Sequence, residues 1–217
     1  MPKMPKMPKI AIMLTGHIRS WNNGCKQSFI KMFNKYNPDV YVITYHTMDY
    51  KSESRLLKEE IQFNLRDINV VDIVVKDENE VYEESKKYKD FCNGDEDQFC
   101  SSMCQYINLK NCFKMVQDSE KKYDYVIKTR FDLKYHFNED IFKDHHQIFT
   151  SNQCCACDFF ACGTYEQMAR YSGLIDNVER IYKQYFYPDI QVSPHMLLHY
   201  HLMGGYTNNL HVEVVRF

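Results

Sequence analysis

The sequence predicts an α/β fold, with a mostly parallel central sheet that is flanked by helices on both faces. Short runs rich in Ile, Val and Tyr alternate along the chain with segments of helical periodicity, which is the pattern of repeated strand-helix-strand units. Glycine and proline are scarce, at 7 and 6 residues of 217, which disfavours a turn-rich barrel and a disordered chain. A chain of this length suits a single domain with one core, expected here over 9–217.

Each element in the first part of the chain has its own signature. Three Met-Pro-Lys repeats preclude a regular helix at the start and predict an extended tail. The nearly continuous apolar and aromatic run at 39–47 predicts a buried parallel strand. The first helix stops before Pro38, and the second begins at a Ser/Glu start that resembles an N-cap. The expected elements are a tail at 1–8, strands at 10–14, 39–47 and 69–75, and helices at 22–37 and 52–66.

The rest of the predicted fold begins with an acidic stretch. Residues 76–98 hold few apolar side chains, so we expect a loop with room for one short helix. A long amphipathic helix then leads directly into the fourth strand. Near the end, Ser193 and Pro194 mark a helix start, because serine caps a helix and proline fits its first turn. The remaining expected elements are strands at 123–130, 147–151, 158–164 and 211–217, and helices at 99–123, 165–171, 175–187 and from 193.

Composition and charge narrow the function. The formal net charge of −2 gives no overall field to attract nucleic acid or an anionic membrane, so we expect neither partner. The sequence shows no secretory signal or membrane-length apolar run, which predicts a cytoplasmic location and free thiols for its nine cysteines. It also lacks the motifs of dinucleotide-binding dehydrogenases, P-loop nucleotidases and G-x-S-x-G hydrolases.

Polar side chains and one glycine gather where the first and fourth predicted strands end: Thr15, Gly16, His17, Arg19, Lys128, Arg130 and Asp132. Open α/β sheets bind ligands at the carboxyl ends of their parallel strands. Basic side chains beside a small-residue turn suit an anionic ligand, since arginine grips a phosphate through two N–H groups. The pattern therefore indicates a nucleotide-diphosphate site.

These stretches resemble the GT-A glycosyltransferases. The runs IAIMLTGHIRSW, DVYVITYH and YDYVIKTRFDL are similar to that family, in particular to small viral and bacterial groups that carry TRFD where other members carry D-x-D. The size and the order of elements also resemble the N-terminal domain of a chlorella-virus glycosyltransferase that decorates the capsid protein. The resemblance covers about residues 9 to 200. It implies a GT-A (Rossmann-like) fold and transfer of a sugar from a nucleotide-diphosphate donor to a glycan or glycoprotein. The donor that the resemblance favours is a UDP-sugar.

The resemblance also implies roles for individual residues. The donor would lie against Thr15, Gly16, His17, Arg19, Lys128 and Arg130. Asp132 matches the last acidic position of D-x-D and His211 a late histidine, which implies a Mn²⁺ or Mg²⁺ site that bridges the diphosphate. Arg130 replaces the usual first aspartate, so it would lie against a phosphate or pair with an acid nearby. Asp158 or Asp189 would be the base that an inverting enzyme needs at the acceptor hydroxyl.

Other functions share some of these features. The incomplete acidic motif also fits a binding or assembly domain without transfer activity, and the same sheet and metal serve a sugar nucleotidyltransferase. His195 and His199 lie four residues apart on one face of the last predicted helix, which suits a hydrogen-bonded histidine or a metal pair. If the source is viral, the expected location is the host cytoplasm. Further domains of a longer polypeptide are possible partners.

Overall fold

The computed structural model describes residues 7–48, 55–92, 94–137, 139–142, 148–151, 158–186, 192–203, 206–210 and 212–214. The predicted tail at 1–8 therefore lies mostly outside the described residues. The strands of the central sheet are β1 (Ile10–Thr15), β2 (Asp39–Tyr45), β3 (Val70–Lys76), β4 (Tyr125–Arg130), β6 (Ile148–Ser151), β7 (Ala161–Gly163) and β8 (Tyr206–Leu210). A separate antiparallel pair consists of β5 (Leu133–Tyr135) and β9 (Val212–Val214).

The central sheet has the order β3-β2-β1-β4-β7-β6-β8. β1 runs parallel to β2 and β4, β2 to β3, and β6 to β8. Among the described strands, β7 is the one that runs antiparallel to both of its neighbours. The prediction of a mostly parallel α/β sheet is confirmed.

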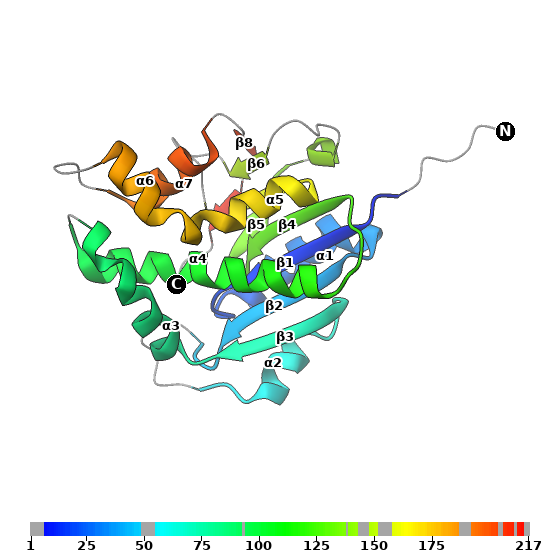
Figure 1. Cartoon of the computed structure of the whole chain (residues 1–217). Helices are drawn as coiled ribbons and strands as arrows, with labels where there is room; N and C mark the ends of the chain where they lie inside the picture. Colours follow the sequence, from blue (N-terminus) through cyan, green and yellow to red (C-terminus); the bar gives the residue numbers. More distant parts are fainter. Residues whose placement is uncertain are drawn as a thin grey trace.

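Helices cover both faces of this sheet (Figure 1). They are α1 (Lys26–Phe33), α2 (Lys58–Leu65), α3 (Glu78–Ser85), α4 (Glu96–Asp118), α5 (Tyr165–Ser172), α6 (Val178–Tyr185) and α7 (Pro194–Leu202). α4 crosses one face and shares a core with α5, α6 and α7, whereas α1 and α2 pack on the other face. Side chains alternate along each strand, so Ile12 and Met13 are both fully buried but in opposite cores.

Several elements differ from the prediction: β5 and β8 were not predicted, and α1 is shorter than the expected helix at 22–37. α2 begins at Lys58 rather than near Ser52, and residues 49–54 lie outside the described residues. The backbone N–H of Leu56 donates to the His46 carbonyl (2.6 Å), so the chain is still bonded to the end of β2 just before the helix. The Leu57 N–H then donates to the Glu60 carboxylate (2.7 Å), which satisfies a group at the helix start.

The acidic stretch 76–98 is more helical than predicted. It forms α3, a 3₁₀ segment at Lys86–Phe91 and the first turn of α4. The carboxylates of Asp77 and Asp95 accept backbone N–H groups at the starts of α3 and α4, so the acidic residues act as caps. Val81 supplies the buried contact that a loop prediction overlooked. No helix in the described ranges combines the length and apolar character needed to cross a bilayer.

Candidate functional site

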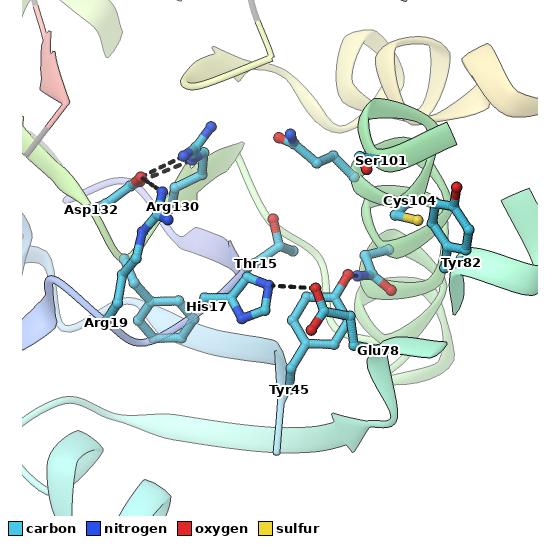
Figure 2. A pocket seen from close by; sticks show the side chains of 14 residues that line it. Thr15, His17, Arg19, Tyr45, Glu78, Tyr82, Ser101, Cys104, Arg130 and Asp132 are labelled. Carbon is cyan, nitrogen blue, oxygen red and sulfur yellow. Dashed lines mark hydrogen bonds and ion pairs between the residues drawn. The ribbon is translucent and has the colours of Figure 1, made fainter. Parts of the chain in front are cut away.

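A pocket of about 180 Å³ opens at the carboxyl ends of β1, β2 and β4. Thr15, Tyr45 and Arg130 are the last residues of these three strands, and all three line the pocket. The opposite wall comes from α3 and α4 (Figure 2). The full lining is Thr15, Gly16, His17, Arg19, Tyr45, Glu78, Tyr82, Ser101, Cys104, Gln105, Asn108, Arg130, Phe131 and Asp132.

The turn after β1 depends on Gly16, whose φ of 111° lies in a region that side-chain-bearing residues rarely adopt. Its N–H donates to the Ile43 carbonyl (3.1 Å), and its carbonyl accepts the hydroxyl hydrogen of Thr44 (2.9 Å). Both bonds tie the turn to β2. The chain therefore leaves β1 in a fixed direction, which carries His17 and Arg19 to the pocket.

Replacing Gly16 by alanine is expected to lower the free energy of unfolding by about 1 to 3 kcal/mol, because the positive φ becomes strained. There is space for the new methyl group, so the loss comes from the backbone alone. Gly173→Ala is the matched control, because Gly173 also has open space around it but a φ of −78°. Urea unfolding of both variants tests this; an equal loss in the two would contradict the backbone explanation.

Two arginines converge on one carboxylate at the basic side of the pocket (Figure 2). Arg130 donates to Asp132 through Nε (2.8 Å to Oδ1) and through Nη2 to Oδ2. Arg19 Nη2 lies 3.4 Å from the same Oδ2. The Asp132 side chain is 4% exposed, against 17% for Arg130 and 29% for Arg19. The carboxylate is therefore buried beneath two guanidinium groups, and the cluster has a net positive charge.

One buried ring and one partly buried ring hold this cluster in place. Phe131, between Arg130 and Asp132, is fully buried and meets the Trp21 ring edge-on (centroids 5.4 Å apart). The Arg130 guanidinium carbon also lies 4.8 Å from the centroid of the Phe159 ring. A bidentate contact with Asp132 and a ring contact together hold the Arg130 plane in one orientation.

The other end of the pocket is aromatic. The His17 ring stacks on Tyr45, with centroids 4.5 Å apart, and its Nε2 lies 3.3 Å from a carboxylate oxygen of Glu78. The Tyr45 hydroxyl accepts an N–H from Asn108 (2.6 Å), and burial raises the pKa of that hydroxyl. Burial also raises the pKa of the Cys104 thiol to about 11, so this cysteine stays protonated at neutral pH and is a poor nucleophile.

No protein-family model matches this chain, and neither does any curated protein. Among solved structures, it is similar to the apo form of mouse xyloside xylosyltransferase 1. The identity is 12% and the TM-score 0.47, over 91% of this chain and 81% of that one. A likeness this distant says nothing of the activity.

The structure brings together most of the residues that the sequence proposed for a donor. Thr15, Gly16, His17, Arg19, Arg130 and Asp132 all line the pocket. Lys128 does not, because it is buried (1% exposed) and its ammonium group donates to the Phe159 carbonyl at 3.4 Å. Asp158 lies near the start of β7 and faces His195, outside the pocket lining. Asp189 and His211 lie outside the described residues, so their predicted roles stay predictions.

One wall of the pocket was missed in the sequence. Four lining residues lie on one face of α4, at spacings of three and four: Ser101, Cys104, Gln105 and Asn108. Such a polar stripe on a helix that is otherwise apolar on its inner side is a signal that could have been found. Glu78, just after the cap of α3, was hidden because its segment was expected to be a loop.

The structure shows one of the two predicted metal ligands, Asp132, and it faces arginines; the metal role of Asp132 and His211 stays a prediction. Asp132, the predicted ligand, already bonds two arginines through its oxygens. A metal ion there would add a further cation beside two guanidinium groups. Over the ranges that the structure describes, no three His, Cys, Asp or Glu side chains lie close enough together to hold a metal. We therefore derive the chemistry of this site from its arginines.

Proposed function

We propose that this protein is a glycosyltransferase that moves a sugar from a nucleotide-diphosphate donor, such as a UDP-sugar, to a hydroxyl of a glycan or glycoprotein. The observation that carries the proposal is the pair of arginines fixed by buried Asp132 at the carboxyl ends of β1 and β4. The GT-A resemblance of the sequence agrees with it. On that resemblance alone, a viral capsid protein is a proposed acceptor.

The arginine pair suits the chemistry of such a donor. Breaking the bond between the sugar and the diphosphate leaves negative charge on a phosphate oxygen, and fixed cationic donors stabilise that charge. The bidentate contact with Asp132 uses Nε and Nη2 of Arg130 and so fixes the plane of the guanidinium group. A diphosphate beside the pair would therefore meet guanidinium groups that are already oriented, so little ordering entropy is lost on binding.

In this arrangement the aromatic end of the pocket takes the nucleoside. A base is flat and mostly apolar on its faces, so it suits the wall formed by the stacked His17 and Tyr45 rings. Glu78 beside them is an acceptor for sugar or base N–H and O–H groups. Charge and shape thus divide the pocket into a phosphate end and a nucleoside end.

Calorimetry with UDP and with UDP-glucose, UDP-galactose and UDP-N-acetylglucosamine tests the proposal. We expect binding in EDTA as well as in Mn²⁺, with dissociation constants within about threefold, because arginines supply the positive charge. Arg66→Ala is the control, since Arg66 is 60% exposed and lies outside the pocket. Loss of binding in EDTA would instead favour the predicted metal site at Asp132.

Turnover distinguishes the remaining functions. A glycosyltransferase releases UDP from at least one of these donors, either to an added glycan or slowly to water. Binding without release from any donor, across a panel of glycan acceptors, would indicate a binding domain. Formation of diphosphate from a sugar phosphate and UTP would identify a nucleotidyltransferase.

A further inference from the structure

A second polar cluster lies beside Arg130, toward β7, and does not line the pocket. β7 runs antiparallel to β4, and its first residue, Ala161, pairs with Lys128. The residues just before Ala161 therefore pass the carboxyl end of β4, where Arg130 stands. The contact between the Arg130 guanidinium carbon and the Phe159 ring confirms this placement. Asp158 precedes Phe159, so its carboxylate belongs to the same edge of the sheet as the arginine pair.

Asp158 faces a histidine from a distant part of the chain. His195 Nδ1 lies 3.5 Å from Asp158 Oδ1, and the His195 ring meets Phe159 edge-on with centroids 6.3 Å apart. His195 is in the first turn of α7, whose start is fixed because Ser193 Oγ accepts the Met196 N–H (3.3 Å). Arg130, Phe159 and His195 thus form a continuous line of contacts from the phosphate end of the pocket.

The two members of the pair differ in access. The Asp158 side chain is 5% exposed, whereas that of His195 is 35% exposed. His195 Nδ1 itself is shielded, so the exposure belongs to the rest of the side chain, where Nε2 is the other nitrogen. A substrate hydroxyl can therefore approach the histidine but not the carboxylate.

We propose that His195 is the base that deprotonates the acceptor hydroxyl and that Asp158 positions it. The inference rests on the proposed glycosyltransferase function and assigns a role within it. His195 Nδ1 is buried and makes no hydrogen bond to the described residues, with Asp158 Oδ1 at 3.5 Å. An Nδ1–H donated to this carboxylate when substrate binds leaves the Nε2 lone pair as the proton acceptor. The carboxylate also stabilises the imidazolium that forms when the proton arrives. In this proposal His195, and not Asp158 as the sequence suggested, is the base.

The reaction balances with these groups. The acceptor O–H gives its proton to His195 Nε2 as its oxygen forms a bond to C1 of the sugar. The bond from C1 to the diphosphate oxygen breaks, and its electron pair stays on that oxygen beside Arg19 and Arg130. The imidazolium then releases the proton to water, which restores the neutral ring. No oxidant or further reactant is required.

The test uses the full chain and measures UDP release from whichever UDP-sugar the wild type turns over, without an added acceptor, so that water is the acceptor. His195→Ala is expected to lower kcat about 100-fold, as for loss of a general base, with the dissociation constant for UDP unchanged. Added imidazole is expected to raise the kcat of His195→Ala at least about tenfold, because the side chain that imidazole replaces is partly exposed. Asp158→Asn should lower kcat without imidazole rescue, and His199→Ala, four residues along α7, is the matched control with wild-type kcat.

The outcomes separate this inference from the proposed function. A wild type that turns over no donor contradicts the glycosyltransferase proposal and the inference with it. An active wild type whose His195→Ala variant keeps its kcat, or is not rescued by imidazole, overturns the role of His195 alone. UDP binding and thermal melting of each variant report folding, so a folded Asp158→Asn variant with wild-type kcat would refute the positioning role.

Discussion

Replacing Arg130 by alanine is expected to raise the dissociation constant for UDP by about 100-fold, which corresponds to the loss of one or two charge-assisted hydrogen bonds to phosphate. The physical reason is the fixed orientation of this guanidinium between Asp132 and the Phe159 ring. Arg130→Lys should recover less than half of the lost binding free energy, because an ammonium group cannot bond Asp132 at two points and face a phosphate at the same time.

Calorimetry with UDP measures this effect, and Arg66→Ala provides the matched control at an exposed arginine. Arg19→Ala should show a smaller loss, because its contact with Asp132 is longer, at 3.4 Å, and its side chain is more exposed. A comparison with uridine, which lacks the diphosphate, tests the location of the effect. If Arg130→Ala weakened uridine as much as UDP, the guanidinium would not be the phosphate donor.

Replacing Asp132 by alanine is expected to lower the free energy of unfolding by about 3 kcal/mol, because two guanidinium groups would lose their buried counter-charge. The partial exposure of both arginines keeps the loss at the lower end of the range for buried ion pairs. Chemical unfolding measures it. Asp176→Ala is the control, since its ion pair with Lys110 is exposed and contributes at most about 1 kcal/mol.

A second background shows whether the loss is due to pairing. In an Arg130→Met chain the same Asp132→Ala change should cost much less, because the principal partner has already gone. Equal losses in both backgrounds would show that Asp132 acts through something other than Arg130. UDP binding to the Asp132→Ala variant should also weaken in EDTA, where a metal plays no part, since both arginines lose their anchor.

Local sequence was sufficient for the four parallel strands β1 to β4 and for one helix start, but not for β8 at the edge of the sheet. These strands were predictable because runs such as 10–14 and 39–47 are nearly continuous in apolar and aromatic residues, as burial on both faces requires. The start of α7 was predictable because Ser193 and Pro194 act within one turn of chain. The helix in the acidic stretch was not predicted with certain bounds. The core contact of Val81 is with residues such as those of α4, which are distant in the local sequence.

The site was predictable to the extent that strand ends determine it. Thr15, Gly16 and Arg130 were proposed from their positions, since parallel strands end at one edge of the sheet. Lys128 followed from the same rule but is buried beneath the edge, with its ammonium on the Phe159 carbonyl. Residue type and spacing gave no measure of that depth.

The sequence by itself determined a parallel α/β sheet with basic and acidic side chains after its first and fourth strands, because hydrophobic runs and strand ends are local features. Only the tertiary structure decided how those charges pair. Arg19 and Asp132 are 113 residues apart, and β1 and β4 bring them together. The same folding buries Asp132 under both guanidinium groups. The carboxylate that the sequence suggested as a metal ligand therefore forms ion pairs with Arg19 and Arg130.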